Sequence, residues 1–248
     1  MSNEKTEGLI IRLADFSESS KVITWFTRDF GKTASLAKGA KRLKSSFEAA
    51  IDLLATCRIV FIRKSSGGLD LLTEAQLVNR FRPYPGSLSN LYVGYYIAEL
   101  LDALTEEYDP HPELYDAAYA AIQHLQEQDD FRKALIKFEL TILEEIGQLP
   151  QFEYCAGCGQ ELGQLESYLY DASNGGLYCR YCEQQRHGNV RVSRGTISVL
   201  QKLSDENTLL SQRLNLSLQQ QREIRQLLST TMSHILGRRP KMAPYLQL

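Results

Sequence analysis

Four of the five cysteines form two Cys-x-x-Cys pairs, Cys155 with Cys158 and Cys179 with Cys182, and twenty residues separate the pairs. Two residues between cysteines allow a tight turn that directs both sulfurs to one point, and two such turns can close a tetrahedron around a zinc ion. Four thiolates leave no open coordination position, so we expect a structural Zn²⁺ and not a hydrolytic one. A redox pair and incidental cysteines are the alternatives to this interpretation.

No other set of residues has a spacing typical of an active site. The sequence contains neither a GxxxxGKS/T nor a GxGxxG phosphate-binding motif, and its four histidines are scattered. Asp129-Asp130 and Glu144-Glu145 are carboxylate pairs, but adjacent positions on a helix face in different directions. Cys57 lies in an apolar stretch and is expected to be a buried thiol. We therefore predict a binding protein and not an enzyme.

A second pattern that suits binding is a basic stretch over residues 30–47. No acidic residue lies between Asp29 and Glu48. A polyanion is the obvious partner, because each phosphate that a cation neutralises releases condensed counterions. A solvated surface loop is the alternative. The predicted phosphate-binding residues of this stretch are Lys32, Lys38, Lys41, Arg42 and Lys44, and Lys21 and Arg28 are expected to extend the track.

The charge of the chain is unevenly distributed. Residues 1–82 hold 14 Lys and Arg against 9 Asp and Glu, whereas residues 83–248 hold 14 against 21. The first part is therefore net basic and the remainder net acidic, which indicates two different kinds of partner.

Aromatic residues interleave with the cations of the basic part, at Trp25, Phe26, Phe30 and Phe47. A small barrel with a positive groove and exposed rings can stack unpaired bases. Strand alternation puts Trp25 and Phe26 on opposite faces, so one of the two is expected to lie in the core, and the sequence does not decide which. Phe47 or Trp25 is the predicted stacking residue.

The elements that must position these residues change type along the chain. Five strands are predicted within about 80 residues, which suits a closed five-stranded barrel of the OB type, with a five-stranded sandwich as the alternative. They cover residues 6–14, 20–27, 33–37, 53–64 and 69–81. Helical periodicity then predicts three amphipathic helices between residues 89 and 146, and two more at 196–203 and about 218–236.

The fold class predicted is thus α+β, with an N-terminal OB-fold barrel, a helical domain and an inserted four-cysteine zinc element. The expected parts are residues 1–82, 83–151, 152–187 and 188–248. The sequence shows no signal peptide and no apolar run of transmembrane length, so we expect a cytoplasmic protein with reduced cysteines and no membrane partner.

Several segments together resemble the bacterial recombination mediator family RecO. They are GLIIRLADFSESSKVITWFTRDFGKTASLAKGAKRLKSSF at residues 8–47, GLDLLTEA at 68–75, the paired Cys-x-x-Cys insert, and HILGRRPKM at 234–242. The resemblance covers the whole chain and is densest over residues 7–48.

The resemblance implies an OB-fold, a helical domain and a zinc element inserted among the helices. It also implies binding to single- and double-stranded DNA and annealing of complementary strands. Expected partners are RecR, the C-terminal tail of single-strand-binding protein and, indirectly, RecA, which is loaded onto DNA coated by single-strand-binding protein. Such a protein would associate with the nucleoid during repair. An OB-fold and zinc-knuckle protein that binds RNA is the alternative, since an aromatic and cationic groove tolerates either sugar.

Overall fold

The computed structural model describes residues 3–42, 45, 47, 50–64, 68–185, 190–204 and 216–246 of the 248-residue chain. The chain divides into two compact units. The first runs to Ala134 and includes residues 244–246, and the second runs from Leu135 to Ala243. The four-part division drawn from the sequence stays a prediction.

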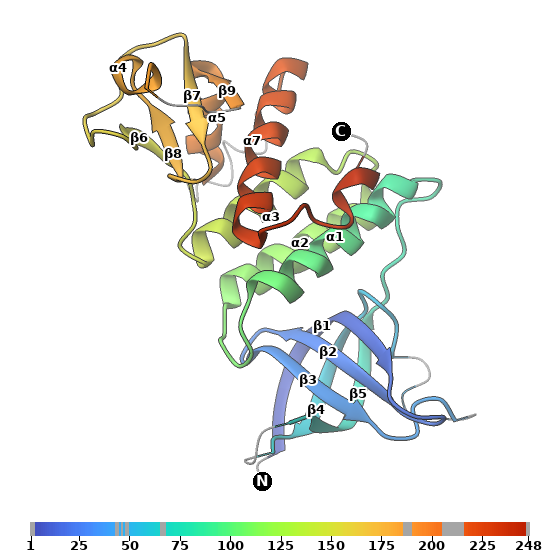
Figure 1. Cartoon of the computed structure of the whole chain (residues 1–248). Helices are drawn as coiled ribbons and strands as arrows, with labels where there is room; N and C mark the ends of the chain where they lie inside the picture. The colour runs from blue at the N-terminus through green and yellow to red at the C-terminus, as the bar shows by residue number, and fades with distance from the viewer. Residues whose placement is uncertain are drawn as a thin grey trace. The chain divides into compact units, whose positions relative to one another are not determined.

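The first unit begins with a closed five-stranded barrel (Figure 1). Neighbouring strands follow the order β1-β2-β3-β5-β4, and all pairs are antiparallel except β3 with β5. The predicted OB-fold is therefore confirmed, and the sandwich alternative is excluded. The strands are β1 (Asn3–Asp15), β2 (Lys21–Thr27), β3 (Gly31–Ala37), β4 (Thr56–Ile62) and β5 (Asp70–Asn79).

Strand β2 shows how the barrel is filled. Ile23 and Trp25 point into the barrel core, where the Trp25 indole donates to the Ser35 hydroxyl over 2.9 Å. Phe26 faces the other way but is equally buried, because its ring lies 6.4 Å from that of Tyr115 in helix α2 (Pro112–Glu127). Of the two rings that the sequence left undecided, Trp25 occupies the core of the barrel.

Two helices complete the first unit, α1 (Leu88–Leu104) and α2 (Pro112–Glu127). The segment between them contacts the barrel at the start of β3. Gly31 packs against the backbone of Asp109, and the backbone N–H of Tyr108 donates to the Lys32 carbonyl over 2.9 Å. The Tyr108 hydroxyl also donates to the buried carboxylate of Asp70. These contacts attach the helices to the barrel.

The second unit combines helices with a small sheet. Its strands follow the order β6-β8-β7-β9, and none of them was predicted from the sequence. The Tyr170 hydroxyl and the Thr231 hydroxyl lie 2.6 Å apart and join β7 to the last helix. The elements after α2 are α3 (Arg132–Glu145), which begins at the end of the first unit, β6 (Gln151–Cys155), β7 (Ser167–Asp171), β8 (Gly176–Tyr178), α4 (Arg180–Glu183), β9 (Val190–Ser193), α5 (Arg194–Ser204) and α7 (Leu218–Leu236). A 3₁₀ turn, η1 (Ala243–Tyr245), lies at the boundary where the chain returns to the first unit.

Both ends of helix α7 are capped by residues typical of those positions. Ser217 and Gln220 form a reciprocal capping box at the start, and Gly237 closes the helix in the left-handed conformation with φ 64°. Over the described ranges, no helix has the length and apolarity needed to span a membrane.

Gly31→Ala is expected to lower the midpoint of thermal unfolding, measured by circular dichroism. An added Cβ would lie 1.9 Å from the Asp109 carbonyl oxygen, and φ of +65° costs a residue other than glycine about 1–2 kcal/mol by itself. Gly86→Ala is the matched control, since its φ is +79° and no described atom lies within 4 Å of the added Cβ. The midpoint of thermal unfolding should fall more for Gly31→Ala than for Gly86→Ala. Equal decreases would mean that the contact between Gly31 and Asp109 contributes nothing to stability.

Candidate nucleic-acid surface and cysteine cluster

Residues 38–42, here called the basic turn, follow directly after β3. The Arg42 N–H donates to the Gly39 carbonyl over 3.0 Å and closes the turn, and Gly39 supplies the positive φ of 73° that the turn needs. Lys38, Lys41 and Arg42 are exposed. The turn therefore presents three cations on a short, hydrogen-bonded backbone.

The basic turn is held against the loop of residues 16–20, which connects β1 to β2. The backbone N–H of Lys41 donates to the Ser19 carbonyl over 3.0 Å, and that of Gly39 donates to the Ser20 hydroxyl over 3.4 Å. The Lys41 ammonium forms an ion pair with Asp15 at 3.0 Å. Segments that lie about twenty positions apart in the sequence thus form one surface.

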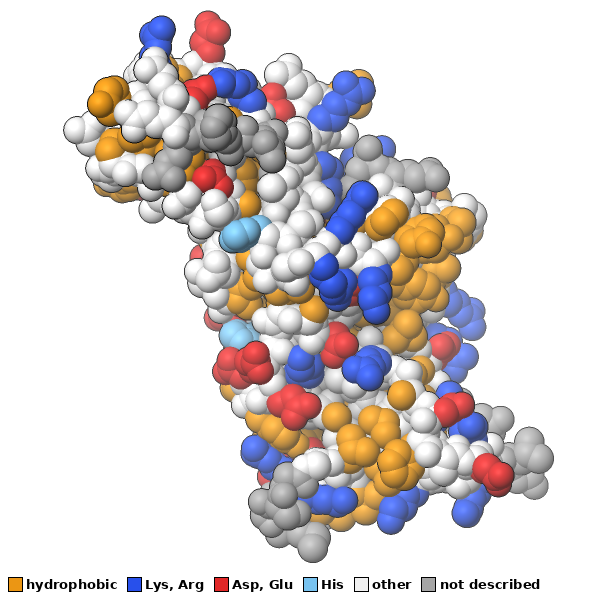
Figure 2. Space-filling model, viewed as in Figure 1, with side chains coloured by type: hydrophobic (Ala, Val, Ile, Leu, Met, Phe, Trp, Pro, Cys, Tyr) orange, Lys and Arg blue, Asp and Glu red, His pale blue; other side chains and the backbone are white. Residues whose placement is uncertain are grey.

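Lys21 belongs to the same surface, because it pairs with Asp15 on β1 and with Ala37 on β3 in the sheet register. The Lys41 ammonium, through its hydrogen bond and charge, lowers the pKa of Asp15, and Lys21 adds to this effect. The Lys41–Asp15 pair is solvent-exposed, and exposed pairs contribute little to stability. Replacing the Asp15 carboxylate by a phosphate as the partner of Lys41 would therefore cost little folding free energy. Figure 2 shows Lys and Arg side chains over the barrel strands, with some carboxylates among them.

Two of the predicted phosphate-binding cations have other partners. The Arg28 guanidinium donates twice to the Asp116 carboxylate on α2, over 3.0 and 2.8 Å. The Lys32 ammonium donates to the Asp102 carbonyl near the end of α1 over 2.6 Å. These contacts link both cations to the helices of the first unit. Phosphate binding by Lys32, and by Arg28 as an extension of the track, stays a prediction. Lys44 lies outside the described residues.

The stacking role predicted for Phe47 or Trp25 needs correction. Phe47 is 6% exposed and Trp25 is fully buried, and both belong to the hydrophobic core of the barrel. The interior of a closed barrel of this size is filled with side chains, and these two rings are among them. Neither ring presents an exposed face on which a base could stack in this structure.

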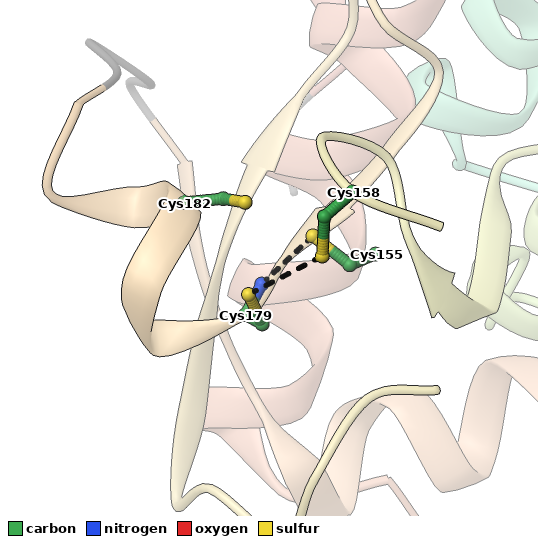
Figure 3. Close-up of side chains that lie close together, drawn as sticks. All are labelled: Cys155, Cys158, Cys179 and Cys182. Atoms are coloured by element: carbon green, nitrogen blue, oxygen red, sulfur yellow. Dashed lines mark hydrogen bonds between the residues drawn. The ribbon is translucent and has the colours of Figure 1, made fainter. Parts of the chain in front are cut away.

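The four paired cysteines come together in the second unit (Figure 3). Their sulfurs all lie within 4.8 Å of one another. Cys155 ends β6, Cys158 follows in the next turn, and Cys179 and Cys182 lie at the start and within helix α4. The Sγ atoms of Cys158 and Cys179 are 3.9 Å apart. Tetrahedral zinc with bonds of about 2.3 Å places sulfurs about 3.8 Å apart, so the set fits such an ion.

The electrostatics of the cluster also suit a cation. Burial acts to raise the pKa of the Cys155 thiol, but the backbone N–H groups of Cys179 and Gly157, which donate to its sulfur over 3.3 and 3.4 Å, lower that pKa to about 6. Desolvation and the neighbouring sulfurs raise the pKa of Cys182 to about 12. Four adjacent thiolates repel one another, and a coordinated divalent cation removes that repulsion. The four cysteines can therefore hold a metal ion.

Cys57 is separate from this cluster, as its sequence context predicted. Its side chain is fully buried in the barrel core, and burial raises the pKa of its thiol to about 12. A thiol that stays protonated is a poor nucleophile and a poor metal ligand.

The sequence matches two family models over almost its whole length. Residues 1–81 match the model described as "Recombination protein O N terminal", and residues 85–243 match "Recombination protein O C terminal".

Relatives named DNA repair protein RecO agree with these models. The protein of Rhodopirellula baltica is 32% identical over 96% of this chain and 97% of its own length. The protein of Syntrophus aciditrophicus is 29% identical over 97% and 93%, and that of Listeria monocytogenes is 29% identical over 79% and 75%. With both family models matched on an OB-fold barrel and a cysteine-containing second unit, the chain belongs to the RecO family of DNA repair proteins.

Proposed function

We propose that this protein is a non-catalytic mediator of DNA recombination and repair that binds single- and double-stranded DNA through its barrel. The observation that carries the proposal is the surface on which Lys38, Lys41 and Arg42 are exposed together and held in place by the β1–β2 loop. Membership of a family of DNA repair proteins selects DNA as the polyanion.

The proposed activity is annealing of complementary strands. Two DNA strands repel each other through their phosphates, and cations that neutralise those phosphates reduce the repulsion. A protein that covers both strands in this way accelerates pairing without making or breaking a covalent bond. The basic turn supplies such cations on a fixed backbone, so little conformational freedom is lost when DNA binds.

The proposed partners follow from the family. Together with RecR, the protein would displace single-strand-binding protein, whose C-terminal tail it would bind, so that RecA can load onto the exposed DNA. The helical part of the chain, as opposed to the basic barrel, is the expected place for these protein contacts. Such work would take place in the bacterial cytoplasm, at the nucleoid.

We also propose that the cysteine cluster binds Zn²⁺ in a structural role. All four ligands would be protein thiolates, which leaves no position for water or substrate. The ion would join the turn after β6 to helix α4.

The proposed function is tested by an annealing assay. Complementary single strands are coated with single-strand-binding protein, and pairing is followed with and without this protein and with and without RecR. Faster annealing in the presence of the protein is the expected result. No acceleration under any of these conditions would overturn the proposal.

Changing Lys38, Lys41 and Arg42 together to Glu is expected to weaken binding to single-stranded DNA and to flatten its salt dependence. Each lost phosphate contact removes about 0.7 from the slope of log K against log salt concentration, so the slope should fall by about 2. Fluorescence anisotropy titrations at several salt concentrations measure this slope.

The matched control changes Lys137, Lys202 and Arg222 to Glu. These exposed cations lie on α3, α5 and α7, outside the barrel. The control therefore changes the net charge of the protein by the same amount and leaves the barrel sequence unchanged. The control should keep the wild-type slope. If both triple variants reduce the slope of log K against log salt concentration by the same amount, the net charge of the protein explains the effect and the basic turn is not the binding site.

Cys179→Ser is expected to abolish zinc binding and to lower the midpoint of thermal unfolding by several degrees, because the free energy of metal binding is part of the free energy of folding. Zinc content per chain is measured by mass spectrometry of the metal, and affinity for single-stranded DNA should change less than twofold. Cys57→Ala removes a thiol outside the cluster and should keep the zinc. A wild-type protein that is folded and free of zinc would contradict this assignment.

A further inference from the structure

One aromatic ring of the barrel has a surface position that the others lack. Trp25, Phe26, Phe47 and Phe61 are buried, Phe81 is 9% exposed, and Phe30 is half-buried with its ring 5.6 Å from that of Phe61. Phe16 is 59% exposed. Over the part of the barrel that the structure describes, Phe16 is therefore the one ring whose face is accessible to a ligand.

Phe16 also sits on an ordered backbone. Its N–H donates to the Ser20 carbonyl over 3.0 Å, and the N–H of Ser20 donates to the Ser17 hydroxyl over 3.2 Å. The Lys41 ammonium contacts the residues on both sides of Phe16, with its Nζ 3.0 Å from the Asp15 carboxylate and 3.4 Å from the Ser17 carbonyl. The backbone that carries the ring is thus held beside the basic turn.

The charges around Phe16 favour a nucleic acid strand as its ligand. Lys21, Lys38, Lys41 and Arg42 belong to this surface, and the carboxylates of its two segments are Asp15, which is paired with Lys41, and Glu18. The net charge of these six side chains is therefore positive. An exposed ring with cations beside it is the arrangement by which OB-folds stack a base and follow its backbone, and the β1–β2 loop is one of the places where they do so.

We propose that Phe16 stacks on an unpaired base and so determines the preference of this surface for single-stranded over double-stranded DNA. The inference rests on the proposed function, because the basic turn must already hold the strand. Phosphates are present in both forms of DNA, so the cations serve both. The faces of the bases are accessible only in a single strand, so only a single strand gains from the ring.

The test compares Phe16→Ala with the wild-type protein in titrations of a thymine oligonucleotide and of a duplex of equal length, at one salt concentration. Affinity for the single strand should fall about 5- to 160-fold, the range expected for loss of one stacked base. Affinity for the duplex should change less than twofold. Phe16→Tyr should restore single-strand binding, whereas Phe16→Leu, which is apolar but has no ring, should not.

A spectroscopic signature tests stacking directly. Phe16→Trp adds an exposed indole to a protein whose natural Trp25 is buried, so single-stranded DNA should quench the added fluorescence and the duplex should not. Tyr84→Ala, at another exposed ring of the same unit, is the control and should leave both affinities unchanged.

The possible failures are distinguishable. If wild-type protein binds neither form of DNA, the proposed function fails. If wild-type protein binds both and Phe16→Ala weakens neither form, or weakens both equally, only the stacking role is overturned.

Discussion

Closure of the barrel by the pairing of β3 with β5 is the constraint on which the rest of the first unit depends. The pairing is short and parallel, with Ser35 opposite Asp70 and Leu36 opposite Leu71. It gives every strand of the barrel two neighbours and so closes the sheet on itself. On its other side β3 pairs with β2 from Gly31 to Ala37. The two ends of β3 have different surroundings.

The start of β3 contacts helix α1 and the segment that follows it. Gly31 lies against Asp109, and the Lys32 ammonium is held by a carbonyl of α1. The end of β3 leads into the basic turn, whose cations are exposed beside the β1–β2 loop. One continuous basic stretch in the sequence is therefore divided by the fold. Its first cation, Lys32, contacts a helix, and its later cations form the surface that we propose for DNA.

The sequence was informative wherever a signal is local. Alternation and turn residues predicted the five strands, helical spacing predicted the main helices, and the spacing of Cys155, Cys158, Cys179 and Cys182 predicted their cluster. The short strands β6 to β9 were missed, because three to five residues between glycines and cysteines show too little periodicity.

The contacts and burial of individual side chains were harder to predict, because they depend on residues that are distant in the sequence. Arg28 and Lys32 meet acceptors roughly 70 to 90 positions away, and no local pattern indicates that Phe47 lies in the core of the barrel. Phe16 was overlooked for a similar reason. An aromatic residue within a polar turn was the available signal, but its position beside Lys41 becomes apparent only when the two loops are joined.

In our proposal, DNA lies across the β1–β2 loop and the basic turn. Photo-crosslinking of a single-stranded oligonucleotide that carries 5-iodouracil, with the crosslinked residues identified by mass spectrometry, would show which residues the strand contacts. Crosslinks are expected within residues 15–21 and 38–42. Crosslinks confined to the second unit, with none in these two segments, would rule out this position of the DNA.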